Sequence, residues 1–262
     1  DYDLDSHAER IDWKLVSQCC IPSWISIKHK DKIDWSMFLQ TEPRKKTAHL
    51  LQVTDKINQC AYIFCDENLK QAYYNDEFVN AFPHIIDYHW YVKNKNIRST
   101  TLLKFWNRFN SNLISRHQRL TLSILKEKLY YINWKLASAV EMSEEVLECA
   151  KHYVCWDIIC EKQKLSDWCI RQNISLCNMK KIAQYQILSE DFILQHCATL
   201  DMSIVSQYQR LTYKFIKKHI AILDCNALQK NKTLYTTLVF TKDNKCFIFD
   251  TQQLTDDKVI FL

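Results

Sequence analysis

A short pattern recurs ten times along the chain: an apolar residue, then Asp or Asn, then a position that we name the anchor. The first position is apolar in all ten copies, and the second is Asp or Asn in nine, with Cys155 as the exception. The usual spacing is 23 residues, as between Met179 and Met202. The anchors are Trp13, Trp35, Gln59, Tyr88, Ser111, Trp134, Trp156, Met179, Met202 and Cys225. A period of this length indicates tandem repeats, each one small supersecondary unit.

The Asp or Asn before the anchor is typical of a helix N-cap, because its side-chain oxygen accepts hydrogen bonds from the first backbone N–H groups. We therefore expect a short first helix to begin at each anchor, with the residues two and three positions later, such as Leu15 and Val16, facing inward. Caps of this kind are Asp12, Asp34, Asn133, Asp201 and Asp224. The anchor tryptophans, for which we expect core packing, are Trp13, Trp35, Trp134 and Trp156.

A second start signal follows five of the anchors by nine or ten residues and consists of an apolar residue followed by Ser or Thr. Ser189 and Thr212 are examples, and Thr121, Ser143 and Ser166 occupy the same position. Acidic residues often follow, where the helix dipole favours them. The apolar residue before the cap and the one five residues later have the spacing of a hydrophobic staple. This pattern predicts a second helix in each repeat.

The chain contains no glycine and three prolines, which gives it little access to positive φ and favours helices joined by glycine-free turns. Helices this short are marginal alone, so neighbouring repeats must stack. We predict a mainly α fold, an α-solenoid of about ten helix–turn–helix repeats over residues 11–230, after an N-terminal extension at 1–10. Residues 231–262 contain β-rich runs at 238–240, 246–249 and 259–262, which predict a small β-hairpin cap.

Three stretches carry a resemblance: Lys30-Asp31-Lys32-Ile33-Asp34-Trp35, Leu188-Ser189-Glu190-Asp191-Phe192-Ile193, and Ser206-Gln207-Tyr208-Gln209-Arg210-Leu211-Thr212. They resemble the tandem unit D-W-x-x-I-S-x-x-Q-x-L-S-E-x-F-I, which is common in uncharacterised proteins of giant and other large DNA viruses and of some phages. The resemblance covers residues 11–230. It implies a viral origin and carries no shared activity.

The repeat is least regular over residues 36–87. The segment 42–46 interrupts the second unit, and the third unit is the longest, with its extra length expected within 66–83. Insertions in solenoids form loops that often lie on the binding face. The alternative is a decayed repeat with a longer helix. The partner-binding candidates in this region are Arg44, Lys45, Lys46, Tyr73, Tyr74, Phe78 and Phe82.

The cluster that most resembles a metal site is Cys149, His152, Cys155 and Cys160, because zinc prefers Cys and His ligands at short spacings. Cys155 and Cys160 fall at positions that the repeat uses for structure, so we expect no metal and no cofactor. No Ser/His/Asp order, phosphate loop or His-Glu-x-x-His motif occurs in the sequence. We therefore predict a protein that is not an enzyme and has no small-molecule substrate.

Other recurring residues are expected to serve the repeat itself. His29, His196 and His219 all lie six residues before an anchor, which favours packing or helix capping. Gln118, Gln163, Gln186 and Gln209 all lie seven residues after an anchor. We predict that they form a ladder of amides, which satisfies backbone groups that a glycine-free turn leaves open.

The formal net charge is +5, with the basic residues spread along the chain. No apolar run is long enough for a transmembrane helix, and no signal peptide is present, which predicts the host cytoplasm or the virion as the location. The extended repeat surface favours a protein-interaction or assembly scaffold, with a viral or host protein as partner. The alternative is nucleic-acid binding, although we expect no recurring set of exposed base-reading residues.

Overall fold

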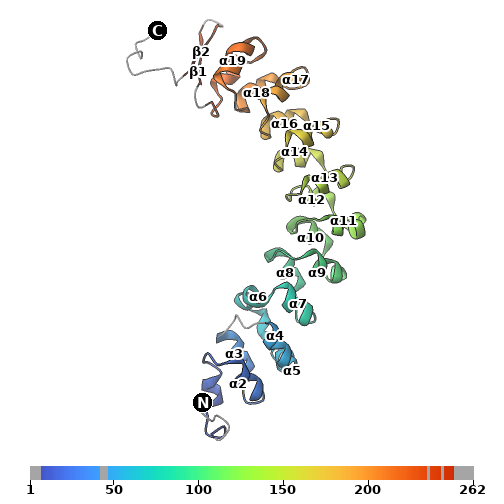
Figure 1. The fold of residues 1–262 in the computed structure, drawn as a ribbon, viewed down its shortest axis with the longest axis vertical. Coiled ribbons are helices and arrows are strands. Elements are labelled where there is room, and N and C mark those ends of the chain that lie inside the picture. The colour runs from blue at the N-terminus through green and yellow to red at the C-terminus, as the bar shows by residue number, and fades with distance from the viewer. Residues whose placement is uncertain (1–6, 42–46, 235–236, 243–244, 251–262) are drawn as a thin grey trace, which may run out of the picture. The chain divides into compact units, whose positions relative to one another are not determined.

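The computed structural model describes residues 7–41, 47–234, 237–242 and 245–250, and the chain is mainly helical (Figure 1). It divides into two compact units, Asp1–Gln118 and Arg119–Leu262, each of which is described by itself. Among the described residues, no helix has the length and apolar character needed to cross a membrane.

The first unit contains ten α-helices and three 3-10 helices among its described residues. The α-helices are α1 (Trp13–Val16), α2 (Ser23–Lys28), α3 (Trp35–Thr41), α4 (Thr47–Leu50), α5 (Thr54–Gln59), α6 (Glu67–Tyr73), α7 (Asp76–Ala81), α8 (Tyr88–Asn94), α9 (Ser99–Lys104) and α10 (Ser111–His117). The 3-10 helices are η1 (Leu51–Val53), η2 (Ala61–Cys65) and η3 (Trp106–Arg108).

The described part of the second unit contains ten more α-helices and two 3-10 helices. The α-helices are α11 (Leu122–Lys128), α12 (Trp134–Ala137), α13 (Glu144–Ala150), α14 (Trp156–Lys162), α15 (Asp167–Gln172), α16 (Met179–Tyr185), α17 (Glu190–Gln195), α18 (Met202–Tyr208), α19 (Tyr213–His219) and α20 (Cys225–Gln229). The 3-10 helices are η4 (Leu129–Tyr131) and η5 (Ile220–Ile222).

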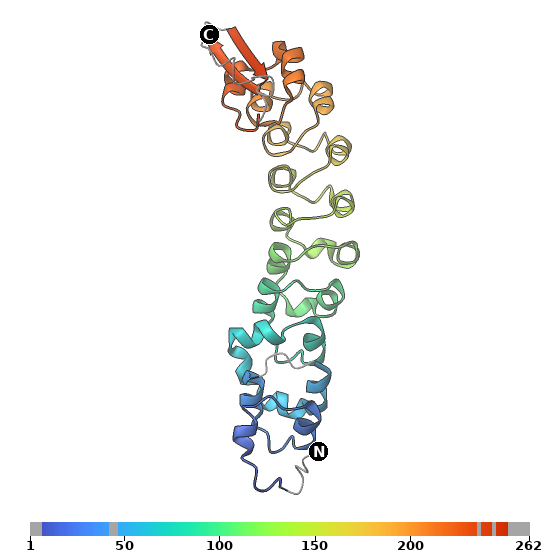
Figure 2. The same ribbon diagram turned by 60° about the vertical axis from the view of Figure 1, so that its left-hand side comes forward.

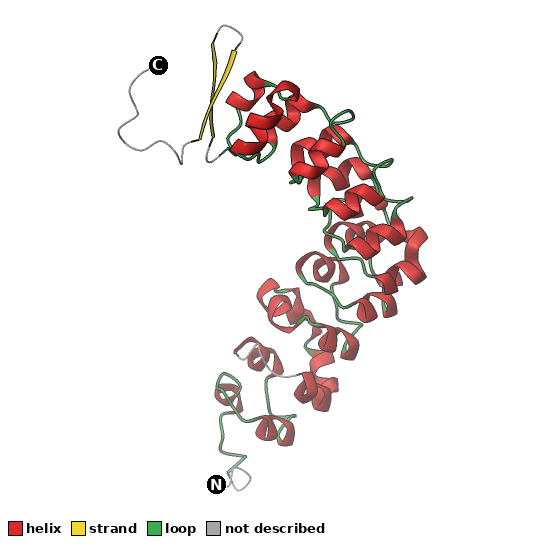
Figure 3. Cartoon of the chain, turned by 45° about the horizontal axis from the view of Figure 1, so that its top comes forward, coloured by secondary structure: helices red, strands yellow, loops and turns green. Residues whose placement is uncertain are grey.

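In the second unit, the first helices of successive repeats lie in one row and the second helices in another (Figure 2). Helix α16 packs between α14 and α18, and α18 also packs against α20. Strands β1 (Thr237–Lys242) and β2 (Lys245–Asp250) pair antiparallel, with Val239 opposite Ile248 (Figure 3). Strand β1 contacts α20 and β2 contacts α19. The third predicted strand, at 259–262, lies outside the described residues.

Apart from the third copy, helices begin where the two start signals place them. Asp12, Asn133 and Asp201 accept hydrogen bonds from backbone N–H groups of the first turn of α1, α12 and α18. The caps of the second helices do the same: Ser189 accepts from Phe192 N and Thr212 from Phe215 N, both at 3.2 Å. Thr121 is an exception, since its hydroxyl contacts Ser123 Oγ rather than capping α11 through the backbone.

The third predicted anchor is wrong. Gln59 ends α5 rather than beginning a helix, and the apolar residue of that copy, Ile57, is buried inside α5. The helix-starting cap is instead Asp66, which accepts from Asn68 N and Leu69 N at the start of α6. The extra length of the irregular region therefore precedes Asp66 and does not lie within 66–83. The prediction was wrong because Ile57-Asn58-Gln59, inside α5, matches the cap pattern.

The inward face of each first helix is narrower than predicted. The residue three positions after the anchor is fully buried in several repeats, as Ile159 and Val205 show. The residue two positions after it is only half-buried at Ile158 and Ile204, and Leu15 is 59% exposed. Each short first helix therefore buries only a narrow line of side chains against the neighbouring repeat.

The anchor tryptophans join the turn before each first helix to the core. Each indole Nε1–H donates to the carbonyl five residues earlier: Trp35 to Lys30 at 2.7 Å and Trp156 to Lys151 at 2.8 Å. Trp35 and Trp156 are buried, whereas Trp13 and Trp134 are half-buried. The ring therefore supplies both apolar packing and a polar bond that fixes the turn.

Candidate interaction surfaces

Successive repeats are joined by a buried side-chain amide, which we name the clamp. In the second unit, Gln186 Nε2 donates to the carbonyls of Cys160 and Gln163, both at 2.7 Å, and its Oε1 accepts from Leu165 N at 2.9 Å. These three backbone groups all belong to the preceding repeat. The predicted amide ladder is present, and its amides reach across to the neighbouring repeat.

The same three bonds recur at other clamps. Gln163 bonds Ser138 O, Val140 O and Met142 N, and Gln209 bonds Ala183 O, Gln186 O and Leu188 N. Asn231 continues the series by donating to Ser206 O and Gln209 O. In the first unit, Gln118 bonds Val92 O, Lys95 O and Ile97 N. Lys95 occupies a clamp position, and its ammonium group donates a hydrogen bond to Gln71 O at 2.6 Å.

A second link uses a buried hydroxyl four residues after the anchor. The Oγ of Ser17, Ser138 and Ser206 accepts from the backbone N–H of the next repeat's cap residue, at 2.8 to 2.9 Å. Cys160 fills the same position, where its thiol contacts Cys177. The hydrogen bond with Cys177 lowers the pKa of Cys160, and the same contact together with burial raises the pKa of Cys177.

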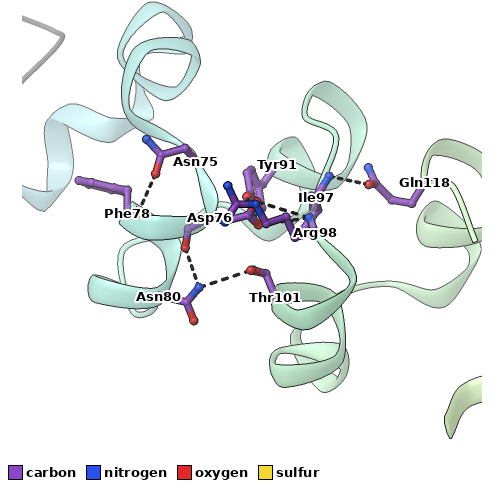
Figure 4. A network of polar contacts seen from close by, with 9 residues as sticks. All are labelled: Asn75, Asp76, Phe78, Asn80, Tyr91, Ile97, Arg98, Thr101 and Gln118. Carbon is purple, nitrogen blue, oxygen red and sulfur yellow. Dashed lines mark hydrogen bonds and ion pairs between the residues drawn. The ribbon is translucent and has the colours of Figure 1, made fainter. Parts of the chain in front are cut away.

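A third link uses the acids at the start of the second helices. Glu190 accepts from Thr212 N at 2.7 Å and Glu144 from Ser166 N at 3.1 Å. Asp76, in the first unit, accepts from Arg98 N at 3.3 Å and from the Tyr91 hydroxyl at 3.2 Å (Figure 4). The first-turn acids thus connect repeats in addition to favouring their own helix dipole.

A network of polar contacts surrounds Asp76 at the start of α7 (Figure 4). Asn80 Nδ2 bridges Asp76 O and Thr101 Oγ1, and the Arg98 guanidinium lies 3.6 Å from the Asp76 carboxylate. Burial, with the Asp76 charge and hydrogen bond, raises the pKa of Tyr91. These contacts connect α7 with α8, with α9 and with the residue before α9, all in the same unit.

The four aromatic partner-binding candidates are not a contact surface. Tyr73, Tyr74, Phe78 and Phe82 are all at most 3% exposed. Phe78 contacts the rings of the other three, and Tyr74 also donates to Ile85 O at 3.1 Å. Their burial supports the alternative of a decayed repeat, although α6 and α7, with 7 and 6 residues, are not longer helices. Arg44, Lys45 and Lys46 lie outside the described residues.

The cysteine and histidine cluster is not assembled into a metal site. Cys149 and His152 are exposed, Cys155 is half-buried, and Cys160 is fully buried in α14. Within the described ranges, no group of three or more His, Cys, Asp or Glu side chains could hold a metal ion. Cys149 lies in α13, Cys160 lies in α14, and the other two residues lie between these helices.

The recurring histidines lie against aromatic rings: His29 against Trp13 at the start of α1, and the other two against rings of their own helices. His196 packs on Phe192 with ring centroids 4.4 Å apart, and His219 packs on Phe215 at 4.9 Å. His29 and His196 are also the residues that end α2 and α17. The predicted packing and capping roles are confirmed for these positions.

Exposed apolar side chains line the turns between repeats in the second unit. We name this set the turn ridge: Tyr130, Tyr131, Tyr153, Leu176 and Ile222. Tyr131, Tyr153, Leu176 and Ile222 each lie three residues before an anchor, so they occupy equivalent places in their repeats. The rings of Tyr130 and Tyr153 are in contact, with centroids 6.1 Å apart. Sequence reasoning missed the ridge, although its regular spacing could have revealed it.

The clamps have exposed neighbours on both sides, a second feature that the sequence reasoning did not recognise. The tripeptides centred on the clamps of the second unit are Lys162-Gln163-Lys164, Tyr185-Gln186-Ile187, Tyr208-Gln209-Arg210 and Lys230-Asn231-Lys232. All eight flanking residues are exposed, whereas the four clamps are buried. No protein-family model, curated protein or solved structure matches this chain.

Proposed function

We propose that the repeats form an α-solenoid and that the protein is a non-enzymatic interaction or assembly scaffold of viral origin, in the virion or the host cytoplasm. Support for the solenoid comes from the three recurring links between neighbouring repeats, above all the clamp amides. A chain held together by nearest-neighbour bonds forms a quasi-one-dimensional array with a long surface. The β1–β2 pair, packed on α19 and α20, would cap the array.

A protein partner is favoured by the turn ridge, which is the observation that carries this proposal. Tyr130 is 84% exposed and Tyr131 65%. Exposed aromatic residues in a row are common in binding sites, since Tyr supplies large contact area at the centre of protein interfaces. Because the aromatic residues of α6 and α7 are buried, the ridge replaces them as the candidate surface.

The test is affinity capture from infected cells with the full chain and the ridge variant Tyr131→Ser/Tyr153→Ser, followed by mass spectrometry. The control is Trp168→Ser, which removes an aromatic side chain that is 56% exposed elsewhere in the same unit. A protein retained by the wild type and the control and lost with the ridge variant supports the proposal. If every captured protein binds the ridge variant equally well, the ridge is not the partner surface.

A further inference from the structure

The residues that flank the clamps are held in one continuous row by the clamps themselves. Gln186 Nε2 donates to Gln163 O, Gln209 Nε2 to Gln186 O, and Asn231 Nδ2 to Gln209 O, at 2.7 to 2.8 Å. Each clamp residue is therefore hydrogen-bonded to the clamp residue of the preceding repeat. Side chains next to the clamps must also lie side by side, one set per repeat.

The backbone at the clamps turns both neighbours outward. Gln163, Gln186 and Gln209 have extended conformations, with φ between −106° and −86° and ψ between 148° and 154°. The residue before each of these clamps is the last residue of a helix, and the clamp itself leaves the helix in the extended conformation. The clamp side chain is buried, and the residues before and after it are exposed to solvent. Ile187, at 82% exposed, and Tyr185, at 48%, show this arrangement.

The composition of this row is strongly biased. We name it the clamp-flanking row: Lys162, Lys164, Tyr185, Ile187, Tyr208, Arg210, Lys230 and Lys232. It contains five cationic residues, two tyrosines and no acid. Within the row, the Lys162 ammonium pairs with the neighbouring Glu161 carboxylate at 2.8 Å. Lysine is depleted at protein interfaces, so this composition favours a polyanionic ligand over a second protein.

The two tyrosines distinguish among polyanions. Tyr185 and Tyr208 occupy the same position in adjacent repeats, and the Lys162 and Lys230 ammonium groups take that position in the repeats on either side. Proteins that bind single strands combine a cationic track for the phosphates with aromatic rings on which bases stack. A duplex keeps its bases stacked on one another, and so offers no base face to the rings.

We propose that the clamp-flanking row binds single-stranded nucleic acid, with the cationic residues on phosphates and Tyr185 and Tyr208 stacking on unpaired bases. This surface is separate from the turn ridge, so the proposal does not depend on a protein partner. Preference between RNA and DNA is decided by the experiment.

The test is fluorescence anisotropy of labelled 20-nucleotide oligo(rU), oligo(dT) and a 20-base-pair duplex with the full chain, over a series of salt concentrations. We expect binding to a single strand, with a dissociation constant that rises about 100-fold for a tenfold rise in salt, as release of counterions from about three phosphates requires. We expect weaker binding to the duplex. No binding to either single strand at low salt, or equal binding to the duplex, would overturn the proposal.

Two pairs of variants locate the site. Lys164→Glu/Lys232→Glu and Tyr185→Ala/Tyr208→Ala should each weaken single-strand binding at least tenfold. The matched controls make the same changes elsewhere in the unit: Lys217→Glu/Lys218→Glu on α19 and Tyr130→Ala/Tyr153→Ala on the turn ridge. These controls should bind within about twofold of the wild type. Circular dichroism melting checks that each variant is folded. Equal losses in row variants and controls would contradict the assignment.

Discussion

Gln209 donates its side-chain amide to the main-chain carbonyl of Gln186, the residue at its own position one repeat earlier, at 2.7 Å. The bond joins residues 23 positions apart, and its counterpart joins Gln186 to Gln163. In several repeats, a buried amide thus satisfies the turn that a chain without glycine must make by other means. The same bond sets the distance between the exposed residues that flank one clamp and those that flank the next.

The hydroxyl link should contribute measurably to stability. Ser138→Ala removes the acceptor of Cys155 N, which lies 2.8 Å from Ser138 Oγ. Leaving this N–H without its partner should lower the free energy of unfolding by about 1–2 kcal/mol. Urea unfolding measures the change. Ser175→Ala, at an exposed position of the same unit, is the control and should stay within about 0.5 kcal/mol of the wild type.

The anchor indole should stabilise the turn through its N–H as well as its ring. Trp156→Phe keeps an aromatic ring but removes the 2.8 Å bond to Lys151 O, so we expect unfolding to become easier by about 1–2 kcal/mol. Trp168→Phe, on an exposed ring, should be nearly neutral. Equal unfolding midpoints for the two variants in urea would show that the indole N–H has no structural role.

Alkaline pH should destabilise the fold partly through Cys169. Burial, with the Glu144 charge, raises the pKa of this thiol to about 11 from an ordinary value of 9.0. Between these two values the unfolded chain releases the proton and the folded chain keeps it, so the free energy of unfolding falls as pH rises. The contribution is fully present below pH 9 and lost by about pH 11.

This dependence can be isolated with Cys169→Ala. Unfolding free energies of the wild type and the variant, measured from pH 8 to pH 11, should converge as pH rises, because only the wild type loses the Cys169 contribution. A constant difference across that range would show that the thiol does not titrate as its burial requires.

Local features of the repeat were predictable from the sequence because they depend on residues close together in the chain. Asp12, Ser189 and Thr212 accept hydrogen bonds from backbone N–H groups in the first turns of the helices that they cap. Asp, Ser and Thr are residue types that N-caps prefer. The same locality explains the error at Gln59, where three residues matched the pattern inside α5. A cap pattern indicates a helix start only if the preceding residues are not themselves helical.

The surfaces could not be predicted as directly. The burial of Tyr74 and Phe78 depends on how α6 and α7 meet, which no local pattern states. The clamp amides were recognisable as a series, but their partners are 21 to 26 residues away. The exposure of Tyr185 and Ile187 follows only once Gln186 is known to point inward.

The central claim is that the clamp amides hold neighbouring repeats together, and Gln186→Ala tests it most directly. The substitution leaves Cys160 O, Gln163 O and Leu165 N without their side-chain partner, which should lower the free energy of unfolding by about 2–4 kcal/mol. The control is Gln184→Ala, two residues earlier, within α16 and half-buried, which should change stability by less than about 0.5 kcal/mol. Urea unfolding of both variants, monitored by circular dichroism, should show the large loss for Gln186→Ala alone; equal stability of the two variants would contradict the account.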